Sequence, residues 1–147
     1  MAGWSRRVRV EMQKCAVGQS PTAQSPGFVG YSTTDPLDDG SGVTEPTSTG
    51  GYARQAITWG AITAGSLGAS VPATNSGSIS WTSTLAWSTG ASALNYLCFW
   101  NASSLASVAE SAFCGYLDVD TPQAVNAADI TLTIANGAVV MNCTPSA

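Results

Sequence analysis

The side chains that could do chemistry are few in this chain. Its 147 residues include five Lys and Arg, nine Asp and Glu, and no histidine. Catalysis near neutral pH needs groups that take and release protons, and histidine is the usual one. Without it, neither a Ser-His nor a Cys-His nucleophile can be assembled. We therefore expect no enzyme activity and no catalytic residues.

The carboxylates gather at two places. Asp35, Asp38 and Asp39 lie in one short segment and could offer oxygen ligands to Ca²⁺. The EF-hand spacing and its terminal Glu are absent, however, and Asp beside Gly and Pro is typical of turns. Asp118 and Asp120 share one side of a predicted strand, as a glycoside-hydrolysing pair could, although charged strand ends are far commoner. We predict no metal and no cofactor.

The four cysteines, Cys15, Cys98, Cys114 and Cys143, form no CxxC pair. A zinc site would need all four to converge from scattered positions, which is improbable in a chain with no histidine. The last three lie among apolar residues and are expected to be small buried side chains. Whether any of the four form disulfides stays open at this stage.

The five tryptophans allow two interpretations. An exposed row of aromatic rings would suit a carbohydrate-binding platform. In β-rich domains, however, most tryptophans are core or interface residues, and we favour that interpretation here.

Charge is divided unevenly along the chain. Residues 1–14 hold four of the five basic residues and one acid, Glu11, which gives +3, and the remaining residues carry −7. Such a basic arm either contacts nucleic acid or an acidic surface or is simply solvated, and nucleic acid is the less expected partner. The candidate interface residues are Arg6, Arg7, Val8, Arg9 and Val10.

The same arm alternates apolar and charged side chains with a period of two, which predicts a strand. An isolated strand leaves its backbone groups unpaired, so it should add to a sheet edge. That edge belongs either to another chain or, alternatively, to its own domain. No stretch of about 20 apolar residues is present, so no membrane-spanning segment is expected.

The elements that would position these residues are short strands. Strand patterns occur at 28–32, 52–59, 79–87, 94–100, 112–119, 130–134 and 138–143, separated by turn-forming residues. The run 94–100 is almost continuously apolar, as in a strand buried on both faces. No long helix is predicted. The pattern predicts an all-β fold, an antiparallel β-sandwich or jelly roll (residues 28–147), preceded by an N-terminal arm and linker (residues 1–27).

Two local predictions follow for the body. Asn136-Gly137 is a strong hairpin signal, so 130–134 should pair with 138–143, with Ile130, Leu132 and Ile134 facing the core. Arg54 is the only basic residue after Lys14. We expect it to pair with the loop carrying Asp35, Asp38 and Asp39, or to bond that loop's carbonyls, and so fix the loop to the second strand.

The order of several segments resembles a widespread family of small tailed-bacteriophage virion proteins. The resemblance rests on 28–39 (FVGYSTTDPLDD), 50–60 (GGYARQAITWG), the apolar run 94–100, 115–117 and the turn at 136–137. It covers about residues 28–143, and its most specific piece is 51–55 (GYARQ). Residues 101–111 form an insertion where members have a glycine, and 1–27 match no member.

The resemblance implies a virion structural protein, assembled in the host cytoplasm, with no catalytic residues. The main expectation is a capsid decoration protein, a homotrimer that contacts the major capsid protein or other virion proteins. One alternative is a tail-fibre or minor tail protein that binds host surface glycan. A third, from another class, is a free carbohydrate-binding module.

Overall fold

The computed structural model describes residues 3–62, 71–87, 93–105 and 112–143. Strands dominate, as predicted. The elements are β1 (Gly3–Trp4), α1 (Arg6–Ala16), β2 (Phe28–Ser32), the short 3-10 helix η1 (Ser48–Gly50), β3 (Gln55–Ala56), β4 (Val71–Thr74), β5 (Ile79–Thr82), β6 (Leu94–Trp100), β7 (Phe113–Gln123), β8 (Thr131–Ile134) and β9 (Val140–Cys143).

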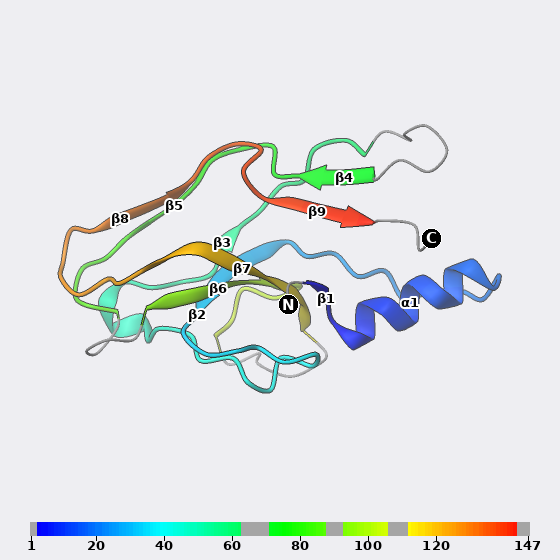
Figure 1. Ribbon diagram of the computed structural model, residues 1–147, viewed down its shortest axis with the longest axis horizontal. Helices are drawn as coiled ribbons and strands as arrows, with labels where there is room; N and C mark the ends of the chain where they lie inside the picture. The colour runs from blue at the N-terminus through cyan, green and yellow to red at the C-terminus, as the bar shows by residue number, and fades with distance from the viewer. Residues whose placement is uncertain (1–2, 63–70, 88–92, 106–111, 144–147) are drawn as a thin grey trace.

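Two layers of antiparallel strands pack face to face. One is a five-stranded sheet in the order β1-β7-β6-β2-β3, and the other consists of the two-stranded ribbons β5-β8 and β4-β9 (Figure 1). The main core lies between the layers, with Val29 and Phe99 from the sheet meeting Trp81, Leu132 and Met141 from the ribbons. The all-β, sandwich-like prediction is thus confirmed.

Strand β6 is buried on both faces, as its apolar run predicted. Leu97 and Phe99 point into the main core. Cys98 and Trp100 point the other way, into a second cluster with Phe113. The long loop between β2 and β3 contributes Val43 to this cluster. The loop therefore acts as a lid on the outer face of the sheet.

Residues 6–16 form a helix, which corrects the strand predicted for this arm. Ser5 begins it, since its side chain accepts a hydrogen bond from the Val8 amide. Gly18, with φ of 75°, follows its end. The period-two pattern spans few residues, and the Arg, Glu, Met, Gln, Lys and Ala around it are strong helix formers. The helix is too short to cross a bilayer, and no other helix of the described residues could do so.

The hairpin predicted at Asn136-Gly137 is also wrong. The turn forms, with φ of 75° at Gly137, but β8 pairs with β5 and β9 pairs with β4. The buried Asn75 separates them, because its amide donates to the carbonyls of Gly77 and Ala135 and accepts from the Val139 amide. The side chains behave as predicted: Leu132 is buried, and Ile130 and Ile134 pack against the core partly buried.

Other strand boundaries shift, and the predicted strand 79–87 is regular only over β5. The predicted strand 52–59 is regular only over β3, and β7 continues four residues beyond the predicted end at Val119. Most of the insertion predicted at 101–111 lies outside the described residues. Cys15, Cys98 and Cys114 are free thiols, and the side chain of Cys143 lies outside the described part.

Candidate functional site: the N-terminal arm and the buried ion pair

The arm is attached to the edge of its own sheet. Strand β1 pairs with β7, with Gly3 opposite Tyr116 and Trp4 opposite Gly115. The next residue continues the contact: the Ser5 amide donates to the Cys114 carbonyl at 2.9 Å, and the Ser5 hydroxyl donates to that of Phe113 at 3.1 Å. The arm was predicted to add to a sheet edge of another chain or, alternatively, of its own domain. In this structure it pairs with its own domain, through two residues of strand that lead into a helix.

A charged contact holds the first turn of α1 beside the β2–β3 loop. The Arg9 guanidinium donates to the Asp38 carboxylate at 2.7 Å and to the Trp4 carbonyl at 2.8 Å. This hydrogen bond from Arg9 lowers the pKa of Asp38 below its ordinary value. Both partners are about half exposed or more, and exposed pairs of this kind contribute little to global stability. The pair orients the helix more than it stabilises the domain.

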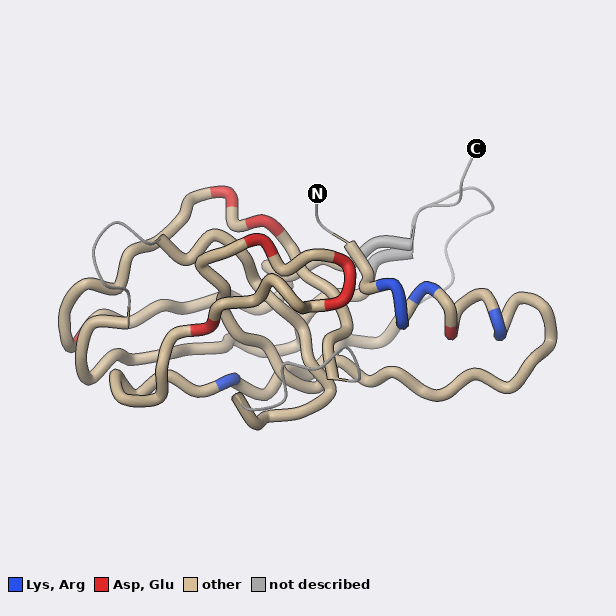
Figure 2. Tube along the Cα trace, turned by 90° about the horizontal axis from the view of Figure 1, so that it is seen from below, with Lys and Arg blue, Asp and Glu red and all other residues tan. Residues whose placement is uncertain are grey.

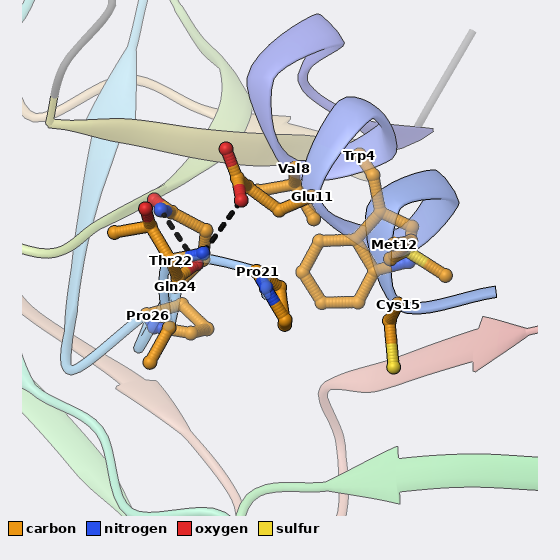
Figure 3. Close-up of a pocket in the computed structure, with 10 residues that line it drawn as sticks. Trp4, Val8, Glu11, Met12, Cys15, Pro21, Thr22, Gln24 and Pro26 are labelled. Atoms are coloured by element: carbon orange, nitrogen blue, oxygen red, sulfur yellow. Dashed lines mark hydrogen bonds between the residues drawn. The ribbon is translucent and has the colours of Figure 1, made fainter. Parts of the chain in front are cut away.

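The helix and the chain after it form a hairpin that projects from the body (Figures 1 and 2). Glu11 links its two limbs, accepting from Lys14 Nζ at 2.8 Å and from the Thr22 amide at 2.6 Å. The hydrogen bond from Lys14 is the main reason why the pKa of Glu11 lies below its ordinary value. Between the limbs lies a groove of about 330 Å³, shown in Figure 3, which is lined mainly by Trp4, Val8, Met12, Cys15, Pro21 and Pro26.

A second hollow of about 480 Å³ adjoins the first and shares Trp4, Gln24 and Pro26 with it. Its other walls come from Trp59, Ile62, Ala73 and Met141. We call it the Trp59 groove. The Trp59 indole donates to the Pro26 carbonyl at 2.7 Å, which fixes the returning limb of the hairpin against the body. The sequence does not predict this groove, because its walls lie far apart in the chain and none of them belongs to a recognisable motif.

Arg54 is a structural residue, but its partner is not the predicted one. Its guanidinium binds Glu45 through Nε and Nη2 and donates from Nη1 to the Ala102 carbonyl at 3.1 Å. The side chain of Arg54 is fully buried, and that of Glu45 is 6% exposed. Glu45 lies further along the same loop. In the sequence, Glu45 is distinguished only by being the single glutamate between Glu11 and Glu110.

Tyr52 completes this buried cluster. Its hydroxyl donates to Glu45 Oε1 at 2.9 Å and accepts from the Tyr31 amide at 2.7 Å. Burial, with the nearby Glu45 charge, raises the pKa of Tyr52 well above its ordinary value, so the hydroxyl stays protonated. Gly30 makes room, since a Cβ there would lie 2.6 Å from Glu45 Oε1. Tyr52 and Arg54 belong to 51–55, the most specific part of the sequence resemblance. Their role in this structure is therefore to hold the buried cluster together.

The other candidate residues do not converge. The Asp35 and Asp39 carboxylates accept from the amides of Leu37 and Ser41, two residues further on, as in ordinary Asx turns. Asp120 is exposed at the far part of β7. Among the described residues no three His, Cys, Asp or Glu side chains are placed to share a metal ion. Arg6 and Val10 are exposed on α1, Arg7 is half-buried and Val8 is buried.

Three of the five tryptophans are enclosed by protein. Trp81, Trp87 and Trp100 are buried, and Trp4 and Trp59 are partly buried. The indole nitrogens of Trp81 and Trp87 donate to the carbonyls of Ala53 and Gly50. The interpretation as core residues is therefore right for Trp81, Trp87 and Trp100, whereas Trp4 and Trp59 pack against the core and also line the Trp59 groove.

Comparison with known proteins identifies the family. The family described as "Podophage GP4 fiber I protein gp80" matches residues 7–142. No curated protein and no solved structure matches the chain. The match covers the body and nearly all of α1 and the linker, so the arm, which the sequence resemblance left unmatched, is part of the family's pattern. The chain belongs to the family of the Podophage GP4 fiber I protein gp80 and is a bacteriophage virion structural protein.

Proposed function

We propose that this protein is a fibre component of the phage particle that works by contact and not by catalysis. The observation that carries the proposal is the match of a fibre protein family to residues 7–142. The site geometry agrees with it, because Glu45, Asp38 and Glu11 are each engaged in an ion pair within the fold. Charged groups paired in this way position elements of the fold, as a protein that works by contact requires.

The competing assignment is capsid decoration, the main expectation from the sequence resemblance, and the small share of charged residues, 10% of the chain, suits the dense packing of such a protein. Low charge suits a fibre equally well, and the family description names a fibre. The two assignments differ in copy number, since a decoration protein covers the head and a fibre is present a few times.

Quantitative gel densitometry of purified virions, normalised to the major capsid protein, measures this number. We expect far fewer copies of this protein than of the major capsid protein. Immunogold label should lie at the tail end of the particle. Hundreds of copies per particle, with label over the head, would establish decoration instead. The contacts made would then be with the major capsid protein.

A further inference from the structure

The turn between β8 and β9 holds the only Asn-Gly pair of the sequence, Asn136-Gly137. An asparagine side chain can be attacked by the backbone nitrogen of the residue that follows it, and glycine, which has no side chain, hinders this attack least. Both residues are exposed, and a Cβ added at Gly137 would have no described atom within 4 Å. Water and hydroxide therefore reach the reacting atoms freely.

The reaction open to this pair is deamidation, which needs water and no enzyme. The Gly137 nitrogen gives up its proton and forms a bond to Cγ of Asn136, while the bond between Cγ and Nδ2 breaks and that nitrogen leaves with the proton as ammonia. Water then opens the cyclic succinimide. Addition at Cγ restores the backbone and leaves aspartate, and addition at the main-chain carbonyl carbon leaves isoaspartate. A water molecule is consumed for each ammonia released, and nothing is oxidised or reduced.

In the folded chain the attacking nitrogen is engaged. The Gly137 amide donates to the main-chain carbonyl of Asn75 at 2.9 Å, an ordinary length for such a hydrogen bond. This bond holds the proton whose loss activates the nitrogen. It also fixes the orientation of the peptide plane, which must rotate before the nitrogen can approach Cγ of Asn136. Asn75 therefore restrains the reaction in two ways.

Asn75 is itself fixed by contacts on both sides of the turn. Its side-chain amide donates to the Ala135 carbonyl at 2.9 Å, and its side-chain oxygen accepts from the Val139 amide at 2.9 Å. Its own backbone amide donates to the Val139 carbonyl at 3.3 Å. We call these contacts, together with the bond from Gly137, the Asn75 lock. Because Asn75 is 1% exposed, the lock opens only when this part of the second layer opens.

We propose that Asn136 is a deamidation site whose reaction is controlled by the Asn75 lock. While the lock is closed the side-chain amide persists, and each local opening lets some chains convert irreversibly to aspartate or isoaspartate. Either product adds a negative charge to a chain that already carries −4. Isoaspartate also lengthens the backbone of the turn, which connects the two ribbons of the second layer (Figure 1). The modification therefore records how often this part of the layer has opened, and it does so whether the protein lies in a fibre or on the head.

The first test follows the purified full chain in a mildly alkaline buffer, either folded or unfolded in guanidinium chloride. Cleavage before aspartate releases a peptide that begins at Asp129 and contains Asn136. Mass spectrometry detects the replacement of an amide by a carboxyl group, and fragmentation of the peptide distinguishes Asn136 from Asn142. We expect the folded chain to react about tenfold or more slowly than the unfolded chain, because only molecules with an open lock can react. Equal rates in the two states, or reaction at Asn142 and not at Asn136, would overturn the proposal.

The second test opens the lock by mutation. Asn75→Ala removes the side-chain contacts that hold the Asn75 carbonyl in place, so Asn136 of the folded variant should react several times faster than in the native chain. Arg54→Lys is the control, because it weakens the other layer and leaves the lock intact. Both variants are compared at denaturant concentrations that give them the same free energy of unfolding, and Arg54→Lys should then be the slower. If near-UV circular dichroism shows that Asn75→Ala does not fold, Asn75→Ser, which retains a polar group, takes its place. A native rate in the Asn75 variant, or equal rates in the two variants, would show that the lock does not control the reaction.

Discussion

The guanidinium of Arg54 lies over the ring of Trp100, with its central carbon 3.6 Å from the ring centre. One edge of the guanidinium binds Glu45 and another reaches the Ala102 carbonyl. The cation is therefore covered by an aromatic face and bonded at its edges, which is how a protein holds a charge away from water. Through this arrangement one residue joins β6, the chain after it and the lid formed by the β2–β3 loop.

Removing either charge of this pair should strongly destabilise the body. Arg54→Ala leaves the Glu45 carboxylate buried without its counter-ion, which we expect to lower the free energy of unfolding by about 3–5 kcal/mol. Arg54→Lys keeps the charge but loses the forked geometry, so it should still destabilise measurably. Urea denaturation monitored by tryptophan fluorescence measures both effects. If Arg54→Lys unfolds at the native midpoint, the geometry of the guanidinium is unimportant.

The attachment of the arm should depend on the absence of a side chain at Gly115. A Cβ there would lie 2.5 Å from the Gly3 carbonyl oxygen and 3.1 Å from the Trp4 Cα. Gly115→Ala should therefore displace β1 from the edge of β7 and loosen α1 while the sandwich stays folded. Hydrogen exchange by mass spectrometry should show lost protection confined largely to residues 3–16.

The matched control for this substitution is Gly77→Ala. Gly77 has no atom within 4 Å of an added Cβ, so the arm should keep its native protection. Unchanged exchange of the arm in Gly115→Ala would show that β1 tolerates the methyl group and that the edge contact does not hold the arm.

The sequence predicted those parts of the fold that depend on local pattern. The bounds of β2 and β6 agree with the predicted 28–32 and 94–100, since apolar β-branched and aromatic runs between turn residues have few other structures open to them. Likewise β5 alternates buried and exposed residues, and hydroxyls on its outer side face those of β8, as in Thr82 opposite Thr131. Both follow from a period of two.

Other features depended on tertiary contacts that no local pattern contains. The arm has a strand period and helix-forming residues together, and Ser5, which caps the helix, is also bonded to Phe113 and Cys114 of β7, so a tertiary contact fixes where the helix begins. The pairing of Arg54 was assigned to the clustered acids Asp35, Asp38 and Asp39, whereas its buried partner is Glu45, a single acid that lies nearer in the sequence. The hairpin at Asn136-Gly137 was lost because Asn75, 60 residues from Ala135, hydrogen-bonds between the flanking strands.

Asn75 should accordingly be a stability determinant of the second layer. It is 1% exposed, and Asn75→Ala would leave two carbonyls and the Val139 amide without their partner. We expect a loss of about 1–3 kcal/mol for the buried groups left unsatisfied. Thermal and urea unfolding measure it. Ser76→Ala is the control, since Ser76 is exposed and should unfold nearly as the native protein does.

Acid should loosen the arm before it unfolds the body. The Arg9 contact lowers the pKa of Asp38 from 3.8, and Lys14, followed by the Thr22 amide, lowers that of Glu11 from 4.5. A carboxylate with a lowered pKa in the folded state stabilises it above its ordinary pKa, and this contribution is lost as the pH falls through the lowered value. The contacts should therefore be complete above about pH 5 and be lost only as the pH falls below the ordinary pKa values, 4.5 for Glu11 and 3.8 for Asp38.

Carbon chemical shifts of residues 6–16 across this range report the helix directly. They should move toward coil values in acid, while those of β6 and β7, which lack these pairs, stay native. The double variant Asp38→Asn, Glu11→Gln should show the loosened helix already at neutral pH and little further response to acid, because the titrating groups are gone. High salt should weaken the native helix in the same direction, since exposed ion pairs are screened. A helix equally formed at low and neutral pH would show that the Ser5 cap and β1 hold the arm without these charges.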